Sequence, residues 1–510
     1  MNIEQYEKEM IQGDLNNEFE KIIAYVNEAV NNKEICLVEK ELFQRLQHLG
    51  KSLLDCFVKQ HGTGYQKNNP PCSENGKSLE FKGTVDSPYF SIFGEISITR
   101  ASYVNESNKY YYPLDEELNL PATKYSYLLQ KWIKSRDVET DFRDAVEIFN
   151  EIFDFSLLPN MPRRIGTKVS NYVDDFYEQQ PAPSPETEGT HLAIGADGKG
   201  IRIIKSERQT VEESTPKARR EKGEKPGIKK ESVVSVDFSF NPGPREPEEI
   251  VKALLNQFTK KERQQAKQER QKRREQGKVE PRIAINKHIR ATLNGKKCGI
   301  EYLVERVQKR DPNGEKPVIV LIDGDRSLEK AFEKALKTYK IYDRVDAFIL
   351  DIIHVSEYVW KAGTAIHGEK GQDRIDWVND KLLSILQSKV GRVIGGLKQI
   401  ITKNQLSKSR KDAIQKTITY FENHRHMMDY ATYLSKGYHI ATGLVEGACG
   451  SFVKDRMEQS GMRWSIDGAQ SILDMRAVKK NKDWNQFWQF YNKSETSHLY
   501  SDNYIYENAA

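Results

Sequence analysis

Three aspartates end apolar runs, at positions where side chains leave the packed strands of an α/β sheet and become available for chemistry. Asp197 ends LAIGAD, Asp323 ends VIVLID, and Asp351 ends AFILD. An aspartate that follows a strand is also a common turn or capping residue. The spacing alone therefore leaves both a structural and a catalytic role open for each of them.

A fourth acid, Glu446, lies in a helix-forming stretch beside Gly443, Gly447 and Ala448, whose small size would let the helix approach a sheet closely. Two metal ions about 3.5–4 Å apart require several carboxylates from separate elements, because hard magnesium prefers oxygen ligands. Acids from a central strand, a neighbouring strand and a later helix meet this requirement. The pattern suits a site for two Mg²⁺ or Mn²⁺ ions.

The elements around these acids follow an α/β pattern. HLAIGADGKGIRIIK predicts a strand that ends at Asp197, a glycine turn and a returning strand, and KKESVVSVDFSFNP predicts a third strand. Helices are predicted over PEEIVKALLNQF, residues 260–274 and GIEYLVERVQKRD, and buried strands over VIVLID and VDAFILDIIH. Three strands, helix, strand, helix, strand is the order of an RNase H-like α/β layer.

Helical periodicity dominates the rest of the chain. Residues 1–60 predict two or three amphipathic helices, and FSIFGEISITRASY predicts a strand or hairpin. PAPSPETEGT, at 181–190, marks a domain boundary by its Pro, Ser and Thr content. The chain is therefore divided into a mainly helical region for DNA binding and dimerisation (1–180), the first part of an α/β core (190–355), an all-helical insertion (356–435), the C-terminal part of the core with Glu446 (436–490) and a tail (491–510).

Positive charge is concentrated in two segments. Residues 201–230 carry +5 and residues 258–278 carry +6, so the remaining residues sum to −6 within a net charge of +5. Such Lys/Arg patches neutralise nucleic-acid phosphates. The alternative is that both segments are solvated surface without a partner.

A helix pair before the boundary carries further basic residues. A periodic stretch from Asp141 to Phe153 precedes DFSLLPNMPRRIGTKVSNYVDDFY, with Arg163, Arg164 and Lys168 near the start of the second helix. This is the shape of a helix-turn-helix, whose second helix can enter the major groove. Helix pairs with a short turn also occur in most α domains, so DNA contact is one of two interpretations.

The sequence predicts neither a membrane span nor a disulfide framework. It has no run of about 18 apolar residues. Its first thirty residues carry acids throughout and lack the apolar segment of a secretory signal. The five cysteines form no C-x-x-C pair. We therefore expect a cytoplasmic protein without membrane partners.

The C-terminal stretch with VEGAC, VKDRM and SGMRW closely resembles the C-terminal block of ISKra-type bacterial insertion-sequence transposases, which belong to the DDE class. The shorter pieces YYPLDEELNLP, AIGADGKG, VLIDGD and FILDIIHVSEYVW are similar to the same family in the same order. The resemblance covers most of residues 90–490. It implies an RNase H-like catalytic core, preceded by the helical N-terminal region and interrupted by the helical insertion.

The resemblance also implies roles for individual residues. Asp197, Asp323 and Glu446 correspond to the three catalytic acids that hold two Mg²⁺ or Mn²⁺ ions. Asp351 and His354 resemble the D-x-x-H signature that accompanies this triad. The implied partners are double-stranded DNA of the transposon terminal repeats and of the target, bound by at least a dimer near the bacterial nucleoid.

Four residues beyond Glu446 are candidate DNA contacts. Lys454 lies two helical turns further on and would bind a backbone phosphate, with Arg456 beside it. Arg463 and Trp464, in SGMRWS, could hold a flipped or single-stranded base by stacking and cation–π contact. In the alternative, Lys454 is a solvated helix residue, and Trp464 belongs to the core while Arg463 pairs with an acid.

Two other functions compete with transposition. VLIDGDRS fits the D-x-D pattern of haloacid-dehalogenase-like phosphatases, with Asp323 as nucleophile and Asp325 as acid, although the helical region after 355 does not suit that fold. A DNA-binding regulator could also retain the scaffold without catalysis. Within the transposase interpretation, Asp325 and Asp351 remain rivals of Asp323 for the second metal-binding acid.

Overall fold

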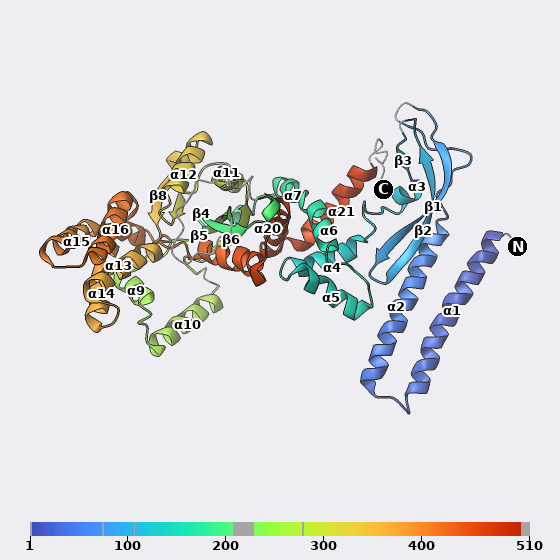
Figure 1. Ribbon diagram of the computed structural model, residues 1–510, viewed down its shortest axis with the longest axis horizontal. Coiled ribbons are helices and arrows are strands. Elements are labelled where there is room, and N and C mark those ends of the chain that lie inside the picture. The colour runs from blue at the N-terminus through green and yellow to red at the C-terminus, as the bar shows by residue number, and fades with distance from the viewer. Residues whose placement is uncertain (1–2, 74–75, 107, 208–228, 278–279, 501–510) are drawn as a thin grey trace. The chain divides into compact units, whose positions relative to one another are not determined.

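The computed structural model describes residues 3–73, 76–106, 108–207, 229–277 and 280–500 (Figure 1). The chain divides into two compact units, Met1–Gln179 with Lys482–Ala510, and Gln180–Asn481. The first division lies beside the predicted joint at 181–190. The second division, between Asn481 and Lys482, comes before the predicted end of the core at 490. The reason is that α21 (Trp484–Tyr500) packs within the first unit, where the ring centroids of Phe487 and Phe176 are 5.5 Å apart.

The first unit begins with a hairpin of two long helices, α1 (Ile3–Ala29) and α2 (Ile35–Gln60), which lie side by side in Figure 1. The sequence left two or three helices open for this region, and the structure has two. Ile22, Tyr25 and Ala29 are buried on α1, at the spacing of one helix face. Within residues 14–29, whose side chains are described, the buried residues of α1 thus form a single stripe.

A small sheet follows the hairpin. β1 (Glu80–Ser91) and β2 (Gly94–Val104) are antiparallel along their whole length, and β3 (Tyr110–Tyr111) adds a short third strand. The predicted hairpin is thus present within a three-stranded sheet. Ile96 and Ile98 of β2 share a buried cluster with Val58 of α2 and with Leu114 of α3 (Pro113–Glu117), which attaches the sheet to the hairpin.

Four helices complete the first unit before the boundary. Ser126 and Asp141 cap the N-termini of the first two with their side chains. The seven residues 154–160 separate the second from the third, which is longer than the three- or four-residue turn of a helix-turn-helix. The single helix predicted as the second helix of that motif is two helices in the structure, the third and fourth of this group. The helices are α4 (Tyr127–Asp137), α5 (Phe142–Phe153), α6 (Met161–Ser170) and α7 (Val173–Gln179).

The second unit is built on a five-stranded mixed sheet of order β6-β5-β4-β7-β8. β5 is antiparallel to both of its neighbours, whereas β4, β7 and β8 are parallel. Every residue of β7 is buried, as expected of a central parallel strand covered on both faces. The unit is mixed α/β, as predicted. The strands are β4 (His191–Arg202), β5 (Lys229–Phe240), β6 (Ile285–Thr292), β7 (Val318–Ile322) and β8 (Val345–Leu350).

The predicted turn after Asp197 is wrong, because β4 continues through it. Asp197, Gly198 and Gly200 all pair with residues of β5, from Val234 to Glu231. Neither Gly198 nor Gly200 has the positive φ of a glycine turn, and a Cβ on Gly198 would meet only the end of the Glu231 side chain. The third strand of the antiparallel part is β6, which the sequence did not predict.

Helices pack around this sheet, and a run of them occupies 352–435. α11 packs against β5 and α20 against β6. α18 continues directly into a π-helical turn, Cys449–Lys454. The helices before β8 are α9 (Pro247–Leu254), α10 (Lys260–Glu275), α11 (Lys296–Arg310) and α12 (Arg326–Thr338). Those after it are α13 (Ile352–His367), α14 (Gln372–Leu386), α15 (Val390–Lys403), α16 (Lys408–His424), α17 (Tyr430–Ser435), α18 (Gly443–Ala448), α19 (Asp455–Met457) and α20 (Ile466–Lys480).

Candidate functional site

Asp197, Asp323 and Asp351 lie at the same end of three neighbouring parallel strands. Asp323 directly follows β7, Asp351 directly follows β8, and Asp197 lies two residues beyond the last β4 residue paired with β7. The last paired residues show that the three strands end at about the same height: Gly195 of β4 pairs with Leu321 of β7, and Ile322 of β7 pairs with Leu350 of β8. The strand-end positions inferred from the apolar runs thus bring the three aspartates to one edge of the sheet.

Glu446 reaches this edge from α18, which lies against β4. A Cβ on Gly195 would meet Cγ2 of Val445 at 2.9 Å, so glycine at this strand position permits the close approach. The sequence suggested Gly443 and Gly447 for this purpose, but a Cβ added to either of them would meet no atom within 4 Å. The close packing therefore depends on a glycine of the strand and not on those of the helix.

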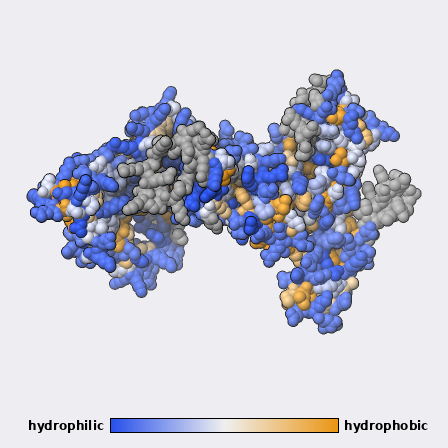
Figure 2. Space-filling view, in the orientation of Figure 1, coloured by the Kyte–Doolittle hydropathy of each residue, from blue (hydrophilic) through white to orange (hydrophobic). Residues whose placement is uncertain are grey.

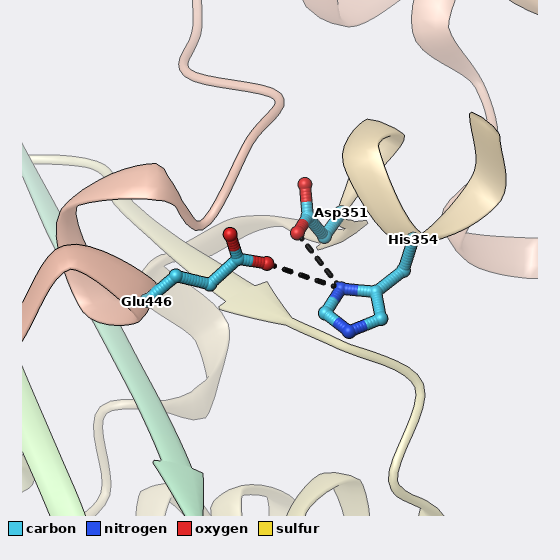
Figure 3. Close-up of side chains that lie close together, drawn as sticks. All are labelled: Asp351, His354 and Glu446. Carbon is cyan, nitrogen blue, oxygen red and sulfur yellow. Dashed lines mark hydrogen bonds and ion pairs between the residues drawn. The ribbon is translucent and has the colours of Figure 1, made fainter. Parts of the chain in front are cut away.

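Asp351, His354 and Glu446 form the tightest group at the site (Figure 3). Nδ1 of His354 lies 3.0 Å from Oδ2 of Asp351 and 3.4 Å from Oε1 of Glu446. One ligand atom from each of the three residues lies within 4.8 Å of the others. The imidazole is therefore placed between two carboxylates, one from the start of α13 and one from α18.

Thr442 links the same two carboxylates. Its hydroxyl donates to Oδ2 of Asp351 at 2.5 Å and lies 3.5 Å from Oε1 of Glu446. The other oxygen of Asp351 accepts the Ile353 amide at 2.9 Å, so Asp351 caps the N-terminus of α13. Asp351 is fully buried and both of its oxygens are engaged by donors. Thr442 precedes Glu446 by one helical turn, a spacing that the sequence analysis overlooked.

The hydrogen bonds at this site shift the pKa values of Asp351 and His354 in opposite directions. Burial alone would raise the pKa of Asp351, but hydrogen bonds from His354, Thr442 and the Ile353 amide lower it below its ordinary value. The hydrogen bond to Asp351 raises the pKa of His354 to about 9, against the effect of burial. Near neutral pH this site therefore holds an ionised Asp351 beside a protonated His354.

The other acids repel one another. Burial and the charge of Asp351 raise the pKa of Glu446 to about 7, and the charge of Asp197 contributes to the same rise. Burial also raises the pKa of Asp323, with a contribution from Asp197 that opposes the hydrogen bond from the Asp325 amide. Asp197 thus acts on both Asp323 and Glu446, so the four carboxylates share one electrostatic field.

Asp325, a rival for the second acid, has a different structural role. Its Oδ1 caps α12 by accepting the Ser327 amide at 2.7 Å, and its Oδ2 forms an ion pair with Lys296. Burial would raise the pKa of Asp325, but the hydrogen bonds from Lys296 and Ser327 lower it. An acid held as a cap and a salt bridge is poorly suited to donate a proton or to release its oxygens to an ion.

Besides Thr442, two more residues that the sequence analysis missed contact the strand-end aspartates. The thiol of Cys449, in the π-helical turn, donates to Oδ2 of Asp197 at 3.2 Å. The hydroxyl of Tyr420, on α16, donates to the Asp323 carbonyl at 2.9 Å. Cys449 follows Glu446 by one turn, and that spacing could have predicted it. Tyr420 carries no local signal, because it reaches the site from a helix distant in the sequence.

The residues predicted to contact DNA after Glu446 fall into two groups. Lys454 and Arg463 are exposed. Arg456 and Trp464 are buried, with the Arg456 guanidinium 4.8 Å from the centroid of the Trp464 ring. The Trp464 indole also donates to the Met457 carbonyl at 3.0 Å. As a correction to the expectation, the buried pair is not accessible to DNA here, and the structure favours the packing role for Trp464.

The basic residues elsewhere also have defined positions. On α6, Arg163, Arg164 and Lys168 are exposed while Ile165 and Val169 are buried, so the basic residues occupy the outer face of that helix. The side chains of α10 are mostly exposed, in agreement with its high charge. Of the basic segment 201–230, residues 208–228 lie outside the described residues.

The residues at the strand ends fit a hard divalent cation. Asp197, Asp323 and Glu446 supply carboxylate oxygens, the ligands that Mg²⁺ and Mn²⁺ prefer. Burial is the main cause of the raised pKa values of Asp323 and Glu446, and the neighbouring acids raise them further. His354 is the one imidazole beside these carboxylates, and it lies within ion-pair distance of both Asp351 and Glu446. Among the described residues, however, the ligand atoms that lie within 4.8 Å of one another belong to Asp351, His354 and Glu446, and Asp197 and Asp323 are not part of that group.

No protein-family model matches this chain, and no curated protein is significantly similar to it. Within the described residues, no helix combines the length and the apolarity that crossing a membrane would require. The chemistry of the site must therefore be inferred from its own residues.

Proposed function

We propose that this protein is a DDE transposase of the ISKra type, with an RNase H-like core that cleaves and joins DNA strands in a metal-dependent reaction. The observation that carries the proposal is the shared electrostatic field of Asp197, Asp323 and Glu446 at one edge of a mixed sheet. The strand order, the helical run between Asp323 and Glu446, and the C-terminal motifs support the same proposal.

In this proposal the carboxylates of Asp197, Asp323 and Glu446 hold two Mg²⁺ or Mn²⁺ ions. When bound, such ions lower the pKa of a water or a DNA 3′-hydroxyl and stabilise the leaving oxygen of an in-line phosphoryl displacement. Asp351 acts as a positioning residue, because it is buried and both of its oxygens are engaged. It holds His354 beside Glu446 and thereby restricts the orientation of the third acid.

The exposed basic residues supply candidate contacts to the DNA backbone. Lys454 and Arg463 follow Glu446 and would bind strands near the scissile phosphate. The outer face of α6, with Arg163, Arg164 and Lys168, and the charged helix α10 would bind duplex DNA. Joining two transposon ends in one complex would require at least a dimer.

The competing phosphatase reaction needs Asp325 as a proton donor next to Asp323. The capping and ion-pair contacts of Asp325 argue against that role. A regulator that binds DNA without cleaving it would retain the basic faces but would have no use for a cluster of mutually repelling acids. A stable fold gains nothing from such repulsion, and this favours the enzyme.

A cleavage assay tests the proposal. Supercoiled plasmid that carries the DNA flanking the gene is incubated with the full chain and Mg²⁺, with EDTA in a parallel reaction. We expect nicking that requires the ion and is lost in Asp197→Ala, Asp323→Ala and Glu446→Gln. Glu305→Gln, an exposed acid of α11, is the matched control and should cleave normally. Normal cleavage by the three variants would refute the assignment, and metal-independent binding without cleavage would identify the regulator.

A further inference from the structure

The α1–α2 hairpin exposes much of the apolar surface of the molecule. Among the side chains whose exposure is described, nine of the seventeen exposed large apolar residues lie between residues 19 and 57. Figure 2 shows apolar surface on this hairpin near the N-terminal end of α2. Contiguous exposed apolar surface of this kind marks an interaction site, whereas isolated exposed residues do not.

These residues form two regular stripes. Phe19 and Ile23 on α1, and Val30 in the turn directly after it, are separated by four and seven positions, and they are 54%, 46% and 73% exposed. Leu46, Leu53 and Phe57 on α2 are separated by seven and four positions, and each is at least half exposed. Such spacing places each set along one side of its helix. We name the six residues the hairpin face.

Both stripes lie on the same side of the hairpin. On α1, Ile22, Tyr25 and Ala29 are buried, and helical geometry puts the exposed stripe roughly a quarter turn from this buried one. On α2, the residues that contact α1 include Arg45, whose guanidinium lies 4.5 Å from the Tyr25 ring, and Ser52, which donates to Glu18. The exposed stripe of α2 is again roughly a quarter turn away. On each helix the exposed stripe lies roughly a quarter turn from the contact side in the same sense, viewed from the N-terminus of that helix. Because the helices are antiparallel, these two quarter turns bring both stripes to the same face of the hairpin.

We propose that the hairpin face binds the same face of a second copy of this chain, so that two hairpins form an intermolecular four-helix bundle. Six large apolar side chains that are about half exposed supply roughly 600 Å² on each copy. The pair would then bury roughly 1,200 Å², the lower end of the range for stable protein interfaces. A two-fold axis pairs identical surfaces, so one apolar face is sufficient for both partners.

The charges of the hairpin favour a second copy over a membrane surface. α1 carries seven acids and two lysines, whereas α2 carries three acids and four basic residues. In a bundle of two copies, the acidic α1 of one hairpin can lie beside the basic flank of α2 from the other. An anionic membrane would instead be repelled by α1, since helices that bind such surfaces are rich in Lys and Arg.

The test is the mass of the full chain in solution, measured by light scattering during size-exclusion chromatography. We expect twice the chain mass of 58.9 kDa for the natural protein at micromolar concentration. The double variant Leu46→Glu, Leu53→Glu should show a two-fold lower mass, because charges at the interface centre raise the dissociation constant at least about 30-fold. Leu158→Glu changes a 64% exposed leucine elsewhere in the same unit and should remain dimeric.

Circular dichroism checks that the variant keeps its helices, and the milder Leu46→Ser repeats the test if it does not. A natural protein of single-chain mass would overturn the proposal, and so would a double variant that remains dimeric. Binding of a monomer to phosphatidylserine vesicles would also overturn it and would identify a membrane as the occupant. None of these readouts uses DNA or metal, so the proposal does not depend on the proposed function.

Discussion

One buried and one partly buried cluster of charge lie in the second unit, and they differ in how their charge is balanced. In the first, Asp237 of β5 accepts hydrogen bonds from Arg306 at 2.6 Å and from Arg310 at 2.7 Å. Arg310 also binds both oxygens of Glu188, at 2.9 and 2.6 Å. Two arginines thus face two acids. Burial would raise the pKa of Asp237, but these guanidinium groups lower it to about 2.

In the second cluster, four carboxylates face one imidazole, and the pKa values of Asp323 and Glu446 are raised. A balanced buried network holds elements together, because each ion has its partner. An unbalanced cluster does not stabilise the fold, and it persists where a ligand supplies the missing charge. This difference in charge balance is consistent with the proposed role of the strand-end acids and with a structural role for the Asp237 network.

The largest expected effect is a difference in the free energy of unfolding between variants of the two clusters. Asp237→Asn removes one partner of a buried ion network and should lower the free energy of unfolding by about 3–5 kcal/mol. Glu446→Gln removes a repelling charge and should leave that free energy unchanged or raise it. Urea unfolding followed by circular dichroism measures both. If the two variants lose equal stability, the proposed difference between the clusters is wrong.

The Asp237 network should also respond to acid. The folded-state pKa of about 2 lies below the value of about 3.9 for an unfolded aspartate. The stability that this carboxylate contributes is therefore present above about pH 4 and is lost as the pH falls from about 4 to about 2. The contribution at stake is about 3 kcal/mol. The difference in stability between the natural protein and Asp237→Asn should shrink over this range, and a constant difference would contradict the assignment.

A smaller effect should appear in the hydrogen bonds around the acids. Cys449→Ala removes the donor to Asp197 and should weaken metal-dependent cleavage by about 10-fold, the scale found for residues that orient metal ligands. Cys449→Ser keeps a donor and should restore most activity. Cys298→Ala, at an exposed cysteine of α11, is the control. Equal activity of the alanine and serine variants, whatever its level, would show that the hydrogen bond has no positioning role.

The sequence predicted the acids better than their surroundings. Apolar runs before Asp323 and Asp351 located two strand ends, because a buried parallel strand reads as a continuous apolar stretch. The same reasoning placed a turn at Asp197, since it could not distinguish a glycine needed for a turn from one within an extended strand. Arg456 looked like a DNA contact because sequence spacing alone does not reveal that a long charged side chain is buried. Tyr420 was missed because only tertiary structure brings α16 to Asp323.

In the proposed function, Asp197, Asp323 and Glu446 form one site for divalent cations. Titration of the full chain with Mn²⁺, followed by the loss of the free-ion signal in electron paramagnetic resonance, measures this without DNA. We predict saturable binding by the natural protein and by Asp237→Asn, and binding at least about 100-fold weaker in Glu446→Gln. Equal Mn²⁺ affinity in the natural protein and in Glu446→Gln would contradict the account.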